Sequence, residues 1–151
     1  MTYTTEIIIE LPLDDFIKKL NNAENMKHWQ KGLVRYEYIS GIPGELGSKM
    51  ELFYKLGKRE MNLTETIIYS KLPHELHMTY DTKGVHNIQK NYFESTPEGF
   101  TKWTSKNEFL PTTFTLRMMI LLMPRAFKKQ SMKYLLDFKN FAENDISVNE
   151  A

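Results

Sequence analysis

The stretch from Pro124 to Glu143 has the pattern of a long amphipathic helix. Apolar or small residues recur at intervals of three and four, which places them in one stripe along a helix of about 3.6 residues per turn. The members of this stripe are Phe127, Ser131, Tyr134, Leu135, Phe138, Phe141 and Ala142. Pro124 suits the first turn, where its missing N–H would have no partner in any case. A stripe of this length requires a broad apolar surface to cover it.

The residues before this helix can supply such a surface, because most of them alternate in the way half-buried strands do. We expect strands over residues 4–10, 33–40, 50–56, 61–67, 76–80, 85–95 and 100–110. Short turns rich in glycine and proline separate the later strands, most clearly at 41–47 and 96–99. Six successive strands with such turns predict an antiparallel meander.

Two short helices are expected between the first and second strands, over residues 13–20 and 23–29. The fold class is therefore α+β, with a seven-stranded curved antiparallel sheet around the long C-terminal helix. We predict that residues 1–144 form a single domain and that the polar tail 145–151 is frayed.

Composition narrows the function classes. Twenty basic and nineteen acidic side chains give a net charge of +1, so the protein as a whole has no strong positive charge that would attract nucleic acid. The chain has no cysteine, which excludes disulfides and cysteine chemistry. The N-terminus lacks the features of a signal peptide, and the longest apolar run, 116–123, is too short for a membrane span. We expect a cytoplasmic protein with no transmembrane segment, nucleic-acid partner or cofactor.

The chain resembles the START-like, or helix-grip (SRPBCC), superfamily, in particular its polyketide cyclase/dehydrase-like branch. The resemblance covers nearly the whole length and rests on element order and three stretches: 11–29, the glycine turn 41–48, and the closing helix 127–142. It implies a hydrophobic cavity between the sheet and the C-terminal helix, which relatives use for lipids, sterols, polyketides or plant hormones. The superfamily shares no universal catalytic residue, so the resemblance assigns no catalytic position here.

Glu65 is the most informative single residue. Strict alternation places it on the face of Met61, Leu63 and Ile67, where an unpaired carboxylate is costly to bury. It is either a cavity carboxyl with a raised pKa, or a carboxylate that pairs with Arg59 or Arg35 or turns outward at a bulge.

Other polar residues share the predicted inner faces of strands. Ser105 and Asn107 alternate with Trp103 and Phe109, and they serve either as ligand anchors or as locally satisfied core groups. Tyrosines at 36, 38, 54 and 80 could direct hydroxyls into a pocket. Asn87, Gln89 and Asn91 raise the same question, but either face of their strand could be the inner one. His74 and His77 diverge on a strand, so no metal site is predicted.

The leading hypothesis is noncovalent binding of a small hydrophobic or amphipathic ligand, lipid- or polyketide-like, in this cavity. The predicted lining is Tyr36, Tyr54, Met61, Leu63, Glu65, Tyr80, Trp103, Ser105, Asn107, Phe109, Phe127, Ser131 and Leu135. One alternative is a cyclase- or dehydratase-type enzyme with Glu65 as acid or base. Another is a protein-interaction module that uses the methionine-rich segment 114–123, which could also form a homodimer or lid contact. A more ordinary interpretation extends the long helix through this segment into the core, with a kink at Pro124.

Overall fold

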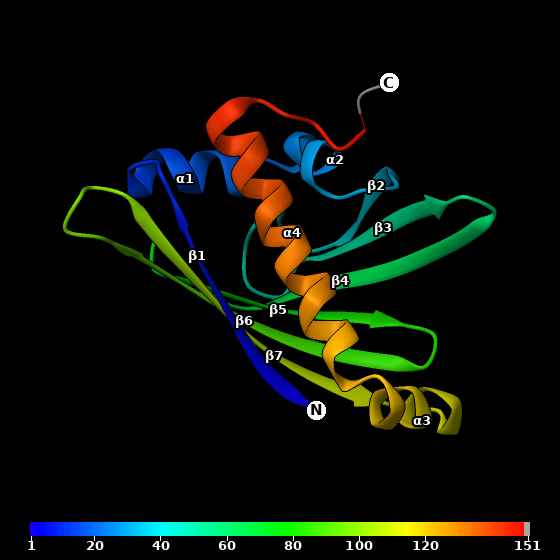
Figure 1. The fold of residues 1–151 in the computed structure, drawn as a ribbon. Coiled ribbons are helices and arrows are strands. Elements are labelled where there is room, and N and C mark those ends of the chain that lie inside the picture. The colour runs from blue at the N-terminus through cyan, green and yellow to red at the C-terminus, as the bar shows by residue number, and fades with distance from the viewer. Residues whose placement is uncertain (150–151) are drawn as a thin grey trace.

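A computed structural model describes residues 1–149 of the chain (Figure 1). The strands are β1 (Thr2–Ile9), β2 (Leu33–Ser40), β3 (Lys49–Leu56), β4 (Arg59–Lys71), β5 (Glu75–Thr82), β6 (Val85–Ser95) and β7 (Thr101–Pro111). The helices are α1 (Leu13–Leu20), the 3₁₀ turn η1 (Ala23–Asn25), α2 (Met26–Trp29), α3 (Phe114–Leu122) and α4 (Pro124–Asn144).

The seven strands form one antiparallel sheet in the order β1-β7-β6-β5-β4-β3-β2. Consecutive strands from β2 to β7 are neighbours, so the predicted meander is confirmed, and β1 closes the sheet beside β7. The sheet curves around α4, which crosses its concave side, while α1 and α2 cover one end (Figure 1). This arrangement confirms the predicted fold class.

The connection between β2 and β3 depends on glycine at position 41. Gly41 has a φ of 79°, and a Cβ atom there would lie 2.8 Å from the Ser48 Cα atom. Any larger residue would force the two ends of this loop apart. The close approach brings Gly44 and Ser48 over the interior of the sheet, where they help to enclose a cavity described below.

The C-terminal half of α4 packs into the main hydrophobic core. Leu135, Phe138 and Ala142 are buried there. The Phe138 ring meets the rings of Phe16 and Trp103 edge to face, with centroids 5.5 Å apart in both cases. Aromatic pairs prefer such edge-to-face contacts. This half of the helix is therefore fixed by dense packing.

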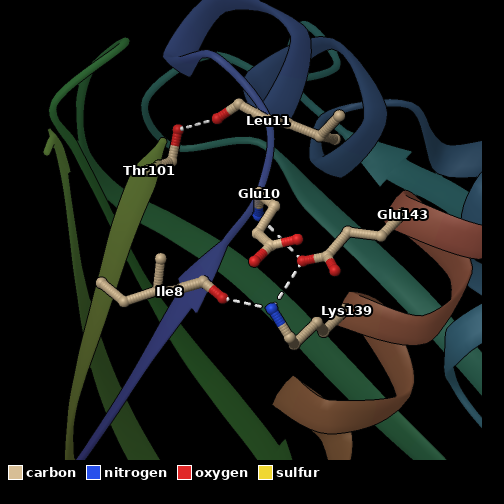
Figure 2. Close-up of polar contacts among 6 residues, drawn as sticks. All are labelled: Ile8, Glu10, Leu11, Thr101, Lys139 and Glu143. Atoms are coloured by element: carbon tan, nitrogen blue, oxygen red, sulfur yellow. Dashed lines mark hydrogen bonds and ion pairs between the residues drawn. The ribbon is translucent and has the colours of Figure 1, made fainter. Parts of the chain in front are cut away.

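Polar contacts also attach this half of α4 to β1 (Figure 2). Lys139 Nζ donates to the Ile8 carbonyl at 2.7 Å and pairs with the Glu143 carboxylate at 2.6 Å. The same carboxylate accepts a bond from the Glu10 backbone N–H at 2.8 Å. We refer to the contacts of Lys139 and Glu143 with β1 and Glu10 as the clasp. It satisfies backbone groups at the end of an edge strand, which would otherwise be free to pair elsewhere.

The methionine-rich segment forms a separate helix, α3, and is not an extension of α4. The Thr113 hydroxyl caps α3 by accepting from the Leu116 N–H at 3.3 Å, and Pro124 begins α4 after a break at Met123. None of the residues of α3 is buried. The expectation that this segment packs in the core therefore differs from the structure. Within residues 1–149, no helix combines the length and the apolar composition needed to cross a bilayer.

The described part of the C-terminal tail lies against α2. The Val148 N–H donates to the His28 carbonyl at 3.0 Å, and Ser147 Oγ bonds His28 Nδ1 at 3.0 Å. Asn149 Nδ2 donates to the backbone carbonyls of Lys27 and Gln30. The sequence predicts a frayed tail from residue 145, whereas these contacts hold residues 147–149 in place; residues 150–151 lie outside the described part.

Candidate functional site

The buried core is divided into two hydrophobic clusters, and a cavity lies between them. The larger cluster contains Phe93, Trp103 and Phe138, and the smaller one contains Met50 and Tyr54. Residues of both clusters line a cavity of about 110 Å³, which we call the inner chamber. Its walls come from β2 to β7 on one side and from α1, η1 and α2 on the other. The apolar contribution is from Leu20, Ala23, Met26, Trp29, Met50, Ile67, Leu76, Met78, Phe93 and Trp103.

Glu65 faces this inner chamber, as the alternation of β4 predicts. Its neighbour across the strands is Tyr80, which lies directly opposite on β5 and also lines the chamber. Burial raises the pKa of the Glu65 carboxyl, and the nearby Tyr80 hydroxyl partly opposes that rise. The same hydroxyl lies 3.5 Å from Met78 Sδ, to which it donates. Arg35, an expected alternative partner, pairs instead with Glu37 on the surface. Within residues 1–149, no cation forms an ion pair with Glu65.

Two further tyrosine hydroxyls lie in this region: that of Tyr54 near Glu65, and that of Tyr134 near Tyr54 and Tyr80. Burial raises the pKa of Tyr54 and of Tyr80 well above 10, and the nearby Glu65 raises both further. Burial also raises the pKa of Tyr134 on α4. The Tyr54 hydroxyl donates to the Gln30 side-chain carbonyl, which lines the inner chamber. At neutral pH the site is thus a group of neutral hydroxyls around one carboxyl whose charged form is disfavoured.

A second, larger cavity lies beneath the N-terminal half of α4. We call this cavity of about 600 Å³ the outer chamber. Its lining residues are Tyr54, Leu56, Arg59, Met61, Met119, Met123, Ala126, Phe127, Gln130 and Tyr134. They come from the β3–β4 hairpin, from α3 and from the first turns of α4. Tyr54 lines this chamber while its hydroxyl bonds Gln30 of the inner one, so the two cavities share a wall.

A ladder of side-chain amides runs across β6 and β7 beside the inner chamber. Trp103 Nε1 donates to Asn91 Oδ1 at 2.9 Å, and Asn91 Nδ2 donates to Gln89 Oε1 at 3.1 Å. Gln89 Nε2 donates to Asn107 Oδ1 at 3.3 Å, and Asn107 Nδ2 donates to Ser105 Oγ at 3.2 Å. Buried polar groups of this kind require such partners. Only Trp103, Asn91 and Gln89 of this ladder reach the chamber wall.

The structure brings six of the thirteen predicted lining residues to the two chambers. Glu65, Tyr80 and Trp103 line the inner chamber, and Tyr54, Met61 and Phe127 line the outer one. The remaining seven lie in neither wall. They are Tyr36, Leu63, Ser105, Asn107, Phe109, Ser131 and Leu135.

Each of these seven has another packing role. Ser105 and Asn107 are buried in the amide ladder, and Leu135 is part of the main core. Ser131 Oγ bonds the Tyr3 hydroxyl on β1, and the Phe109 ring stacks on Tyr3. Leu63 packs against the smaller cluster.

Tyr36 packs against the smaller cluster and lines neither chamber. Its hydroxyl donates to the Glu24 carboxylate at the surface, and this bond is the largest of several effects that raise the pKa of Tyr36 to about 12. The contact joins β2 to η1, so its role in the structure is to hold that edge.

Several chamber residues are absent from the predicted lining. Met26, Trp29 and Gln30 come from the α2 region, where sequence alone gives no indication of which side faces the sheet. The inward position of Gln89 and Asn91 could have been predicted from the register of the β6–β7 hairpin. The 96–99 turn pairs Asn91 with Ser105 and Gln89 with Asn107, so one inward face implies the other.

Histidines at 74 and 77 lie apart, as expected for a strand. His74 Nδ1 bonds the Phe93 carbonyl, whereas His77 is buried between the rings of Tyr69 and Tyr92. Burial lowers the pKa of His77. Within residues 1–149, no three His, Asp or Glu side chains gather as a metal site would require.

At the level of sequence, the chain matches no protein-family model and no protein of curated function. Its fold, in contrast, has many solved counterparts. Norcoclaurine synthase from Thalictrum flavum superposes with a TM-score of 0.72 at 12% identity, over 95% of this chain and 94% of that chain. Ara h 8.0201 gives a TM-score of 0.72 at 12% identity, over 94% and 97%.

A protein of Thermus thermophilus gives a TM-score of 0.74 at 10% identity, over 94% of this chain and 97% of that chain. These similarities extend over nearly the full length of both partners, so they establish the START-like helix-grip fold that the sequence resembles.

Proposed function

We propose that this chain of START-like helix-grip fold binds a small hydrophobic or amphipathic molecule, lipid- or polyketide-like, in the inner chamber beneath α1 and α2 and the outer chamber beneath α4. One observation carries the proposal: Glu65, without a cationic partner among the described residues, faces an apolar cavity. Burying such a carboxyl costs stability, and a protein selected only for stability would replace it with an apolar residue. A ligand that uses the group explains its presence.

The chemistry of the inner chamber suits an uncharged oxygen group of a ligand. Burial favours the protonated form of Glu65, and a protonated carboxyl donates a hydrogen bond. Trp29 also lines this chamber, and its Nε1–H is buried with no partner among the described residues. The Trp29 Nε1–H, and the Glu65 carboxyl in its protonated form, can each donate to an acceptor on the ligand, such as a carbonyl or hydroxyl oxygen. The amide ladder holds Gln89 and Asn91 in position nearby, so Ser105 and Asn107 act on the ligand through them.

The outer chamber suits the apolar part of the same ligand. Its volume of about 600 Å³ lies within the range of small-molecule sites, roughly 300–1,000 Å³. Methionines at 61, 119 and 123 form much of the wall, and their flexible side chains adapt to varied apolar shapes. The polar end of the ligand would then lie at the shared wall near Tyr54.

A chamber-filling substitution tests this proposal. Ala126→Trp places an indole in the outer chamber, whereas Lys129→Trp places the same group on the exposed side of α4. The probe is 1-anilinonaphthalene-8-sulfonate, whose fluorescence rises in apolar sites. We expect Ala126→Trp to weaken probe binding at least about tenfold and Lys129→Trp to leave it unchanged. Equal affinities for both variants and the parent would contradict binding in this chamber.

The natural ligand can be sought directly. Native mass spectrometry of protein purified from its own host, followed by solvent extraction, should find a bound molecule with an apolar body and an uncharged oxygen function. The Ala126→Trp variant serves as the control, since it should carry less of that molecule than Lys129→Trp. Absence of any copurified molecule from all three proteins would count against a tightly held ligand.

Enzymatic activity of the cyclase or dehydratase type is the second candidate. The observation that favours it is the contact between a carboxyl with a raised pKa and the Tyr80 hydroxyl, a pair able to move a proton and polarise a carbonyl. Glu65→Gln separates the two functions. If the protein is a carrier, ligand affinity should change only a few-fold, whereas an enzyme should lose turnover by at least about 100-fold.

A further inference from the structure

Helix α3 exposes a continuous apolar surface. Phe114, Leu121 and Leu122 are 77%, 73% and 75% exposed, and Met118, Met119 and Met123 are also exposed. The helix has apolar side chains all round and buries none of them. It projects from one end of the molecule, beyond the last strand of the sheet (Figure 1). An apolar patch of this kind on a folded domain marks an interaction site.

The charged residues that flank α3 in the sequence are all basic. Between Glu108 and Asp137 the sequence contains no acidic residue but five basic ones: Arg117, Arg125, Lys128, Lys129 and Lys133. Lys133 pairs with Asp137, whereas the other four are exposed and form no ion pair within residues 1–149. The turns of the β3–β4 and β5–β6 hairpins lie on the same side as α3 (Figure 1) and carry Lys58 and Lys83. We call this set of apolar and basic residues the α3 surface.

This charge distribution decides between possible partners. A second copy of the chain, related by a twofold axis, would bring the same cations face to face across the contact. An anionic lipid surface accepts apolar side chains between its headgroups and attracts each nearby lysine or arginine. Acidic residues at this end do not reverse the field, because Glu60, Asp81 and Glu108 are outnumbered by the basic residues of the α3 surface.

We propose that the α3 surface docks on anionic lipid membranes, with α3 lying in the headgroup region as an interfacial helix. Phe114, Leu121 and Leu122 enter the lipid, and the basic residues of α3 and early α4 contact the headgroups. Met119 and Met123 of the same segment line the outer chamber, so docking places that chamber at the bilayer surface. The inference goes beyond ligand binding, since neither Leu121 nor Leu122 lines a chamber.

Vesicle sedimentation with the full chain tests this proposal. The probes are vesicles of phosphatidylcholine alone and of phosphatidylcholine with about one-third phosphatidylglycerol. We expect binding to the anionic vesicles to be at least about tenfold stronger, and to weaken at about 0.5 M salt. Equal binding to both vesicles, or binding to neither, would overturn the proposal.

Matched variants locate the contact. Leu121→Asp with Leu122→Asp should reduce binding to the anionic vesicles at least about tenfold, while Ile42→Asp with Leu46→Asp, an exposed apolar pair in another loop, should not. Lys128→Gln with Lys129→Gln should weaken binding several-fold, and Lys27→Gln with Lys31→Gln should have little effect. Full vesicle binding by the Leu121/Leu122 variant would refute the assignment of this surface.

Two controls separate this inference from others. The Leu121/Leu122 variant should keep the parent's affinity for 1-anilinonaphthalene-8-sulfonate, so a failure of vesicle docking is distinct from a failure of ligand binding. Gel filtration should show the parent at the size of a monomer. A dimer that the Leu121/Leu122 substitutions abolish would assign the surface to a second copy and overturn the membrane proposal.

Discussion

Glu65 and Tyr80 stand directly opposite each other on adjacent antiparallel strands, with both side chains toward the inner chamber. The pair combines an acid whose charged form is disfavoured with a hydroxyl that lies close to it. Tyr54, which lines the outer chamber, lies near this pair.

Replacing the carboxyl should alter how stability depends on pH. The unfolded chain releases the Glu65 proton near the ordinary value of 4.5, whereas the folded protein holds it to higher pH. The folded state therefore binds more protons between the two pKa values, and its stability falls as pH rises through that interval. We expect Glu65→Gln to be more stable than the parent at neutral pH and equally stable below about pH 4.

Urea denaturation across this pH range measures the difference. Glu51→Gln is a suitable control, because it changes the same type of residue on the neighbouring strand outside both chambers. Parallel stability curves for Glu65→Gln and the parent would show that the carboxyl is not perturbed by folding.

Removing the Tyr80 hydroxyl should raise the pKa of Glu65 further. This hydroxyl lies near Glu65, favours the charged carboxylate and is the influence that opposes burial. Tyr80→Phe deletes it while keeping the ring. Carboxyl carbon NMR titration detects the change, with Glu65→Gln to identify the resonance. Tyr36→Phe, which affects a surface contact with Glu24, should leave that resonance unmoved.

The two halves of α4 should respond differently to loss of a phenyl ring. Phe138 is fully buried among aromatic rings, so Phe138→Ala should cost about 3–5 kcal/mol in the free energy of unfolding. Phe127 borders the outer chamber, so the same substitution there should cost less than about 1.5 kcal/mol. Chemical denaturation measures both. Similar large losses would mean that the outer chamber is packed solid in solution.

The clasp offers a test of how α4 is held to β1. Lys139→Met removes the bond to the Ile8 carbonyl together with the pair to Glu143, at an expected cost of about 1–2 kcal/mol. Lys133→Met removes an i,i+4 pair of the same kind that stays within the helix, and should cost only about 0.3–0.5 kcal/mol. Thermal or urea unfolding of the two variants measures both losses of stability. A larger loss for Lys139→Met would show that the contact with β1 stabilises the fold beyond the helical pair alone.

Local patterns predicted most of the fold. Alternation and the glycine turns predicted β2 and β6 with the same bounds as in the structure. The spacing of three and four predicted α4 to within one residue at its C-terminal end. These features depend on neighbouring residues and on one buried face, which a sequence records directly. Segment 114–123 differs because its apolar residues run all round the helix. Such a pattern predicts a helix but does not say whether the rest of the chain covers it.

The candidate site was predictable only in part, for a related reason. Alternation shows that Glu65 and Trp103 face inward, but it does not show where packing stops and a void begins. Leu135 and Phe127 belong to the same helical stripe, yet one is in the core and the other borders the outer chamber. Ser105 and Asn107 face inward as predicted, but Asn107 accepts from Gln89 of β6 and donates to Ser105, so both have partners within the sheet. Voids and partners across strands are properties of tertiary structure.

The clasp holds only the C-terminal end of α4, and the dense core packing lies in the same half of the helix. The other end continues into α3 and borders the outer chamber, where the bond between the Ser131 and Tyr3 hydroxyls and the contact of the Phe127 and Phe109 rings attach it to the sheet. We expect backbone amides of residues 126–133 to exchange with deuterium much faster than those of residues 136–142, although both belong to one unbroken helix. A gradient of this kind would mark the N-terminal end of α4 as the way in and out of the interior.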